Sequence, residues 1–232
     1  MTERGMIFNA EMVRAILDDR KTQTRRPIKW KQTRFTEIGE REDGSKWPWS
    51  EDAEHACDFW HPCPFGAVGD RIWVREAYRF PASLDDVSPT GVGEMAVATG
   101  YRKPWAPTFY EFTGTFSDGW KGFETPPKVS DAGKLRPSIH MPRWASRILL
   151  EITDVRVERL NAISEEDARA EGIIDGGCLN CGEPEPCGCA NPEPDATDAF
   201  AYLWQSIYGQ ENWNANPWVW VIEFKRVEGG AA

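Results

Sequence analysis

Apolar and polar residues alternate along this chain in patterns that predict a few strands and short helices. A helical spacing of apolar residues follows Asn9, a residue type that caps helices, and consists of Met12, Val13, Ile16 and Leu17. The pattern predicts a short amphipathic helix that ends at the acidic pair Asp18-Asp19. A first strand is expected over 6–8, just before this helix.

Four further segments have the composition and alternation of strands. They are residues 22–28, the stretch that follows the Gly69-Asp70 turn, residues 147–160 and residues 217–227. Pro27 lies near the end of the first of these and limits it to a sheet edge, because proline cannot donate to a strand ladder. The last segment is apolar on both faces, which predicts a central strand. Residues 147–160 form either one long strand or two strands joined at Thr153-Asp154.

Two later helices carry start signals in the sequence. Ser164 is followed three residues later by Asp167, which is typical of a helix N-terminus, and Gly172 marks the end of that helix. Asp195 and Asp198 repeat the pattern before a helix that runs to Gly209. Between these elements, three segments lack clear periodicity and are interpreted as insertions into one domain spanning 1–232: about 29–68, 80–135 and 173–195. Short hairpins are expected around 94–102 and 108–116.

The charge distribution changes this picture of an ordinary soluble protein. The chain has 232 residues, a formal net charge of -10 and a sequence pI near 4.9, which argues against a histone-like nucleic-acid binder. Residues 14–34 nevertheless hold eight Lys or Arg against two acids. A concentrated basic segment on an acidic protein favours a defined anionic or polar ligand over general adhesion to polyanions.

Several of these segments together resemble an ASCH domain. The residues that carry the resemblance are the helix followed by Lys21-Thr-Gln-Thr24-Arg, the Gly69-Asp70 turn, the helix Ser164 to Gly172 and the closing strand Trp218 to Phe224. The resemblance implies an α+β fold: a PUA-like (ASCH) mixed β-barrel with flanking helices and long loop insertions. It also implies a ligand such as RNA or a modified nucleoside. The loop Ile139 to Ser146 makes the chain similar to the long ASCH proteins of tailed phages and prophages.

Within that superfamily, some small bacterial members are amidohydrolases that act on N4-acetylcytidine. Their proposed triad, carried onto matching positions, is Lys21, Thr24 and Glu171. The family has glycine two positions before the lysine, and this chain has Asp19 there. The residues alone leave a second interpretation open, in which Lys21 and Glu171 form an ordinary ion pair and Thr24 only fills the strand.

The chemistry of such a triad is intelligible from its residue types. Thr24 would be the nucleophile, Lys21 its base, and Glu171 a proton shuttle or an orienting group. Neighbouring cations can lower the pKa of a lysine and favour its basic form. In a regular strand, however, Lys21 shares a face with Arg25 and not with Thr24. The two triad residues therefore meet only if Lys21 lies in the turn before the strand.

Basic residues near the triad are predicted to contact the ligand. Arg20, Arg25 and Arg26 would hold a phosphate or influence Lys21. A second basic group, made up of Arg136, His140, Arg143 and Arg147, surrounds Trp144. In that group Arg143 and Trp144 would suit a phosphate and a stacked base. A loop anchored by Trp144, with its arginines paired to surface carboxylates, is the equally supported alternative.

Four thiols, Cys178, Cys181, Cys187 and Cys189, lie within twelve residues and have the spacing of a zinc site. We expect a structural zinc there rather than disulfides, since four thiolates complete a tetrahedral ion. An unmetalled loop and redox-active thiols remain as alternatives. A second group, His55, Cys57, His61 and Cys63, matches no common metal motif.

Neither an apolar signal core nor a run of about 18 apolar residues occurs in the sequence. The expected compartment is therefore the cytoplasm, that of the bacterial host if the protein is encoded by a phage. The sequence sets no oligomeric state. Three functions remain open: a nucleoside amidohydrolase, an RNA-binding module without activity, and a phage accessory protein that uses the barrel as scaffold.

Overall fold

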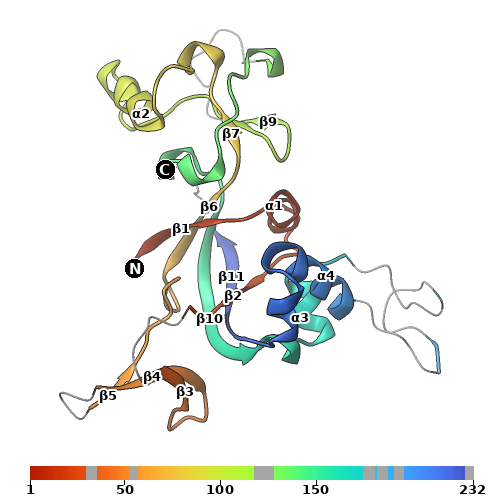
Figure 1. The fold of residues 1–232 in the computed structure, drawn as a ribbon. Coiled ribbons are helices and arrows are strands. Elements are labelled where there is room, and N and C mark those ends of the chain that lie inside the picture. The colour runs from red at the N-terminus through yellow and green to blue at the C-terminus, as the bar shows by residue number, and fades with distance from the viewer. Residues whose placement is uncertain are drawn as a thin grey trace. The chain divides into compact units, whose positions relative to one another are not determined.

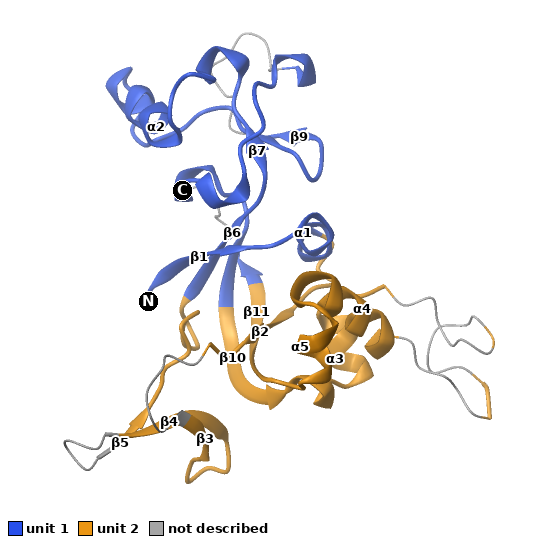
Figure 2. Cartoon of the chain, viewed as in Figure 1, with its two compact units in different colours: residues 1–17, 71–151, 226–232 blue, residues 18–70, 152–225 orange. Residues whose placement is uncertain are grey.

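A computed structural model describes residues 1–29, 36–52, 57–117, 128–174, 181, 188–190 and 196–227 of the chain (Figure 1). The fold is mixed α/β, with one mixed five-stranded sheet and two small three-stranded sheets. The chain divides into two compact units, which Figure 2 shows in different colours. Unit 1 comprises residues 1–17, 71–151 and 226–232, and unit 2 comprises residues 18–70 and 152–225.

Unit 1 contains short strands and two helices. Its strands are β1 (Glu3–Ile7), β6 (Arg71–Arg75), β7 (Tyr78–Arg79), β8 (Phe109–Tyr110) and β9 (Thr115–Phe116), and its helices are α1 (Ala10–Leu17) and α2 (Pro89–Ala98). Single 3-10 turns occur at Ala82–Leu84, Val129–Asp131, Ser138–His140 and Arg143–Ala145.

Unit 2 contains the candidate site. Its elements are β2 (Gln23–Pro27), β3 (Thr36–Glu40), β4 (Lys46–Asp52), β5 (Cys57–Trp60), α3 (Glu165–Ala170), α4 (Ala196–Tyr208) and α5 (Gln210–Asn214). A 3-10 turn, Leu160–Ala162, precedes α3. Strands β10 (Leu149–Arg159) and β11 (Trp218–Val227) lie mainly in this unit. Residues 149–151 of β10 and 226–227 of β11 belong to unit 1.

The five-stranded sheet has the order β1-β6-β10-β11-β2. Strands β1 and β6 are parallel, with Gly5 opposite Trp73, while β10 pairs antiparallel with β6. Strand β2 is antiparallel to β11 and places Thr24 opposite Ile222. The edge position of β2 and the interior position of β11 confirm what Pro27 and the apolar 217–227 segment predict.

Local signals in the sequence fix most element boundaries. The Asn9 side chain accepts a hydrogen bond of 2.8 Å from the Met12 amide, so α1 begins where the cap predicts. Ser164 accepts from the Asp167 amide at the start of α3 in the same way. Gly172 follows α3 with φ 91°, a conformation that glycine adopts without strain. Residues 149–159 form one strand, which decides between the two predicted forms.

Two predictions for the insertions were wrong. The segment around 94–102 is not a hairpin: residues 94–98 complete helix α2, which Ser88 caps and whose first turn contains Pro89, and 99–102 follow the helix. The expected irregular segment 29–68 contains the antiparallel sheet β3-β4-β5. The hairpin expected around 108–116 is present as β8 and β9.

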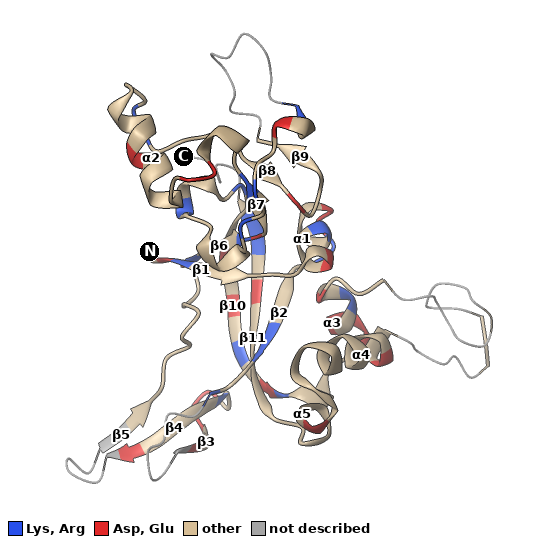
Figure 3. Cartoon of the chain, turned by 45° about the horizontal axis from the view of Figure 1, so that its top comes forward, with Lys and Arg blue, Asp and Glu red and all other residues tan. Residues whose placement is uncertain are grey.

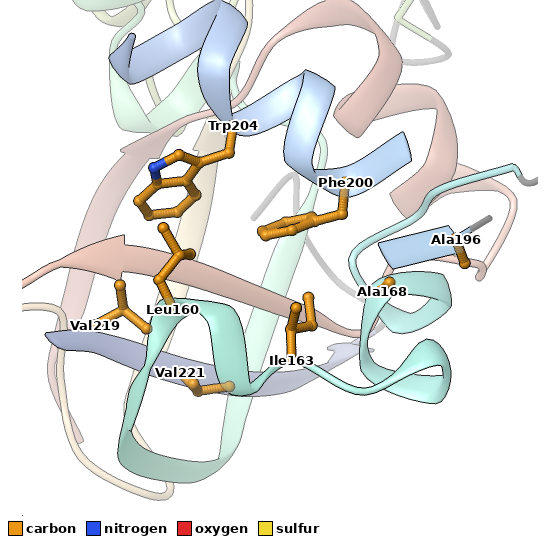
Figure 4. Packing of buried hydrophobic residues seen from close by; sticks show 8 residues of the cluster. All are labelled: Leu160, Ile163, Ala168, Ala196, Phe200, Trp204, Val219 and Val221. Carbon is orange, nitrogen blue, oxygen red and sulfur yellow. The ribbon is translucent and has the colours of Figure 1, made fainter. Parts of the chain in front are cut away.

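The core of unit 2 forms between β11 and the helices. Figure 4 shows Phe200 and Trp204 of α4 packing toward Val219 and Val221 of β11, with Leu160 beside them. All five side chains are buried. Burying a side chain of this size contributes about 1.5–3 kcal/mol, so the cluster holds α3 and α4 against one face of the sheet. That face also carries the odd-numbered residues of β11 and β2.

The structure supports the mixed α/β class, and no closed barrel is found among the described residues. No described helix is long and apolar enough to cross a membrane.

Candidate active site

The turn from α1 into β2 contains the position where this chain departs from the ASCH pattern. Asp19 adopts φ 57°, in the left-handed region that favours glycine. Aspartate tolerates this conformation better than most residues, because its short side chain can bond locally. Arg20 follows, donating to the Gly172 carbonyl at 3.1 Å and pairing with Asp18. The turn therefore keeps a glycine-like backbone without a glycine.

Lys21 and Glu171 meet in the interior of unit 2. Their backbones form an isolated antiparallel bridge, and the Lys21 Nζ donates to Glu171 Oε2 at 2.7 Å and to the Glu171 carbonyl at 2.8 Å. The two side chains are 0% and 2% exposed. Glu171 is placed here because it is the C-cap residue of α3. Two residues that are 150 positions apart in the sequence thus form a buried ion pair.

Burial is the main influence on the protonation of Lys21. Loss of solvent lowers the pKa of its ammonium, and the nearby Arg26 and Arg25 lower it further, while the Glu171 carboxylate opposes them. The net direction is downward. A lysine of this kind releases its proton more readily than an exposed one, which is the property a general base requires.

Arg25 joins the pair to a wider set of charges. Its guanidinium lies 3.4 Å from Glu171 Oε1, 2.8 Å from Asp167 Oδ2 and 3.1 Å from Glu158 Oε2. The Arg25 side chain is 0% exposed. Each oxygen of Glu171 therefore has its own cationic partner, Lys21 for Oε2 and Arg25 for Oε1.

Arg156 connects these groups to the surface of unit 2. It pairs with Asp154, Glu158, Asp167 and Glu223. Glu223 is 41% exposed, so the network runs from a fully buried lysine to solvent. Burial would raise the pKa of Asp167, but the charge of Arg25 and its hydrogen bond outweigh this and lower it. Figure 3 shows acidic and basic residues on β2, β10, β11 and α3.

The Thr24 side chain is buried, but it lies on a different face of β2 from Gln23 and Arg25. Lys21, Gln23 and Arg25 all contact Asp167 or Glu171 of the α3 segment, so they share one face. Strand alternation places Thr24 on the opposite face, beside Ile222 of β11. Within the described part of the chain, no hydrogen bond joins the Thr24 hydroxyl to Lys21 or Glu171. The structure brings two of the three predicted triad residues together.

The chain is not a regular strand between Lys21 and Thr24. The Thr22 amide donates to the Ala170 carbonyl, whereas its own carbonyl accepts from the Phe224 amide. In a regular strand these two groups of one residue point to the same neighbour. The chain therefore turns at Thr22, and Lys21 lies in the turn before β2. This position of Lys21 is required, but does not suffice, for its side chain to meet that of Thr24.

The remaining predicted ligand residues near the triad have different environments. Arg26 is partly buried on the Thr24 face, opposite Trp220 of β11. Arg20 is about one-third exposed and bound to Asp18 and the Gly172 carbonyl. Of the three predicted arginines, only Arg25 directly contacts the Lys21–Glu171 pair.

The second basic group of the sequence is largely built into unit 1. Arg143 pairs with Glu3 at 2.7 Å, and Arg147 pairs with Glu76 at 2.8 Å. Arg136 donates to three backbone carbonyls of the segment 84–87. Trp144 stacks on Phe80 with ring centroids 5.4 Å apart. The stacking of Trp144 and the pairing of Arg143 with the exposed Glu3 agree with the alternative of an anchored loop, whereas Arg147 pairs with a buried carboxylate and not with one at the surface.

Trp144 lines an apolar groove of about 510 Å³ in unit 1. Thr90, Gly93 and Val97 of α2 line the same groove. The groove contains none of the predicted triad residues. Arg143 does not line it, so the structure does not bring the predicted Arg143 and Trp144 together around one cavity.

Two of the four predicted zinc ligands lie outside the described residues. This applies to Cys178 and Cys187 of the four-cysteine segment, whereas Cys181 is exposed and Cys189 half-buried. The described part of the chain contains no group of three or more potential metal ligands. In the second group, His55 is outside the described residues, His61 bonds to Ser50 and Cys63 is buried.

Three acidic or basic residues around Arg25 were not predicted from the sequence. Asp167 was identified only as a helix-start residue, and Glu158 and Arg156 only as residues of a strand. Their one signal is alternation, since Arg156 and Glu158 lie on the same face of β10.

Comparisons with protein-family models, curated proteins and solved structures found no match for this chain.

Proposed function

We propose that this chain recognises RNA or a modified nucleoside through a PUA-like fold of the ASCH type, and that it hydrolyses an amide of the N4-acylcytidine kind. The observation that carries the proposal is the buried pair of Lys21 and Glu171, formed at the end of α3 and the entry to β2. A lysine with a lowered pKa, held by a carboxylate, is an arrangement suited to proton transfer.

The proposed reaction uses three residues. The Thr24 oxygen attacks the acyl carbonyl carbon while its proton passes to the neutral form of Lys21. The bond from the carbonyl carbon to N4 then breaks, and N4 takes that proton and leaves as the cytidine amine. Water hydrolyses the Thr24 ester, which releases the carboxylic acid and restores the hydroxyl. Glu171 holds Lys21 and accepts or returns its proton between the two steps.

This reaction requires the Thr24 hydroxyl to approach Lys21. The backbone leaves the regular strand at Thr22, and we propose that the approach is made there. Arg25 and Arg26 are close enough to Lys21 to lower its pKa. Arg26, which is only partly buried, would provide positive charge for a ligand phosphate.

An RNA-binding module without activity is the second candidate. The observation that favours it is the complete burial of Lys21, together with the position of Thr24 on the other face of β2. In this case the ion pair only stabilises the fold, and the basic residues of the turn bind the nucleic acid.

Incubation with N4-acetylcytidine separates the two candidates. We expect release of cytidine and acetate, a loss of at least about 100-fold in kcat/KM for Thr24→Ala, and a similar loss for Glu171→Gln. Lys103→Ala is the matched control because Lys103 is basic, exposed and outside the basic segment 14–34. Its rate should equal that of the unchanged protein.

The opposite outcome identifies the module. Absence of turnover in a folded protein that still binds RNA would reject the hydrolase. Binding that weakens with salt and upon Arg26→Ala, but is unchanged by Thr24→Ala, would then support the RNA-binding module.

We also propose a structural zinc ion held by Cys178, Cys181, Cys187 and Cys189. The chemistry of the donor set supports it, since four closely spaced thiols fit a tetrahedral zinc. When bound, the ion would order this loop and leave no open position for catalysis. Metal analysis should find one zinc per chain, lost upon Cys178→Ser and retained upon Cys63→Ser. A chain without bound zinc would refute the site.

A further inference from the structure

The charged groups that surround the Lys21–Glu171 pair are divided into two sets of opposite sign. Among the described residues, Arg25 and Arg26 of β2 are the cations that act on Lys21, and Glu171 is its anionic partner. Behind Arg25 lie the carboxylates of Asp167 on α3 and Glu158 on β10. Within the described part of the chain, Arg25 is therefore the one guanidinium that contacts both the pair and the outer carboxylates.

The distances show how Arg25 is shared. Its contact with Asp167 at 2.8 Å is shorter than its contact with Glu171 at 3.4 Å. Asp167 thus holds the guanidinium on the side away from Glu171. Lys21, at 2.7 Å, keeps the stronger bond to Glu171. If Asp167 lost its charge, Arg25 would be less compensated and would interact more strongly with Glu171.

Asp167 is itself held in a fixed position. It belongs to the first turn of α3, where its amide donates to Ser164, and its carbonyl accepts from Gln23. Arg156 contacts its second oxygen at 3.3 Å. A carboxylate fixed on a helix in this way supplies a constant charge at a constant distance from Arg25.

We propose that Arg25 and Asp167 are positioning residues that jointly determine at which pH Lys21 passes its proton. Neither residue needs to touch the reacting atoms. Arg25 favours the neutral amine by its positive charge, and Asp167 offsets part of that charge. The catalytic consequence rests on the proposed function, whereas the effect on the protonation of Lys21 does not.

The proposal requires opposite changes from opposite substitutions. Arg25→Gln removes a positive charge, so Lys21 should keep its proton to higher pH. Asp167→Asn removes a negative charge while keeping size and hydrogen-bonding oxygen, so Lys21 should lose its proton at lower pH. Each midpoint should move by roughly one pH unit, and the double variant should return toward the unchanged protein.

Two measurements test this on the full chain. The first follows the Lys21 side chain by NMR in protein with ¹³C-labelled lysine, with Lys21→Met identifying the signal. The second is the acid limb of the pH profile of kcat/KM with N4-acetylcytidine. Asp198→Asn and Lys103→Gln are matched controls, because they make the same charge changes at exposed positions outside the basic segment 14–34. Neither control should move either midpoint.

The outcomes separate the two proposals. Opposite shifts in both measurements support positioning by Arg25 and Asp167. Opposite shifts by NMR in a protein without turnover support the positioning and reject the hydrolase. Shifts in the same direction, or none in folded variants, overturn the positioning whether or not the protein hydrolyses the substrate. A merely structural role would lower stability without producing shifts of opposite sign.

Discussion

Replacement of Lys21 by methionine is the most direct test of the buried ion pair. Methionine keeps an unbranched side chain of similar length but leaves the Glu171 carboxylate, 2% exposed, without its closest partner. Removal of one member of a buried pair costs about 3–5 kcal/mol, because an uncompensated charge remains in the interior. Arg25 stays 3.4 Å from the other carboxylate oxygen, so we expect a loss near the lower limit, about 3 kcal/mol.

A surface pair in the same unit provides the control. Lys46 pairs with Glu40 across β3 and β4, and both side chains are well exposed. An exposed pair contributes about 0–1 kcal/mol, so Lys46→Met should cost less than about 1 kcal/mol. The free energy of unfolding of each variant is measured by urea denaturation at pH 7, with the m-value checked for constancy.

The double variant Lys21→Met/Glu171→Leu distinguishes a lost pair from a lost contact. Without the stranded carboxylate, the double variant should be more stable than Lys21→Met alone by about 1–2 kcal/mol. Arg25 retains Asp167 and Glu158 in that background. A loss below about 1 kcal/mol for Lys21→Met, or a double variant that loses the sum of both single changes, would refute this reasoning.

Three further results are expected from other parts of the chain. Burial raises the pKa of Glu76 despite its bond to Arg147. Above about pH 4.3 the unfolded chain has lost the Glu76 proton while the folded protein still holds it. Stability should therefore fall as pH rises from about 4.3 through the raised pKa of the folded protein. Glu76→Gln should remove that slope in urea titrations across pH 4–7. Asp19→Val should be about 1–2 kcal/mol less stable than Asp19→Gly, because the left-handed backbone disfavours a branched residue; equal melting temperatures would contradict this. Gly93→Ala places a methyl 2.9 Å from the Trp144 indole, so it should melt below Gly91→Ala, although alanine favours the helix at both positions.

The elements that the sequence predicted correctly depend on contacts between near neighbours. The cap at Asn9 and the end of α3 at Gly172 are local hydrogen-bonding and backbone effects. The continuous apolar run of β11 reflects burial on both faces of the sheet, whereas buried and less buried residues alternate along part of β10. Such signals need no knowledge of the rest of the fold, which is why they predict the structure well.

The elements that were missed depend on distant packing. The glycines of α2 suggest a turn, yet Gly93 lies in the helix because Trp144, fifty-one positions later, packs against its bare backbone. In the β3-β4-β5 sheet, acidic residues between the tryptophans hide the strand pattern. Trp49 and Trp60 are paired across neighbouring strands, which the sequence alone does not reveal. Tertiary contacts override weak local preferences at both places.

The candidate site depends both on local signals and on contacts between distant parts of the sequence. No local pattern joins Lys21 to Glu171, and only the resemblance to ASCH domains predicted their meeting; the structure then added Asp167 and Glu158 through Arg25. The spacing of Lys21 and Thr24 places them on opposite faces of an unbroken strand, so a joint action depends on the backbone between them. That backbone turns at Thr22, whose amide and carbonyl bond to different segments. Thr22→Pro would remove the amide that bonds to Ala170, and it should abolish turnover of N4-acetylcytidine while RNA binding by the basic turn persists. Full activity in that variant would show that the proposed reaction does not need the turn at Thr22.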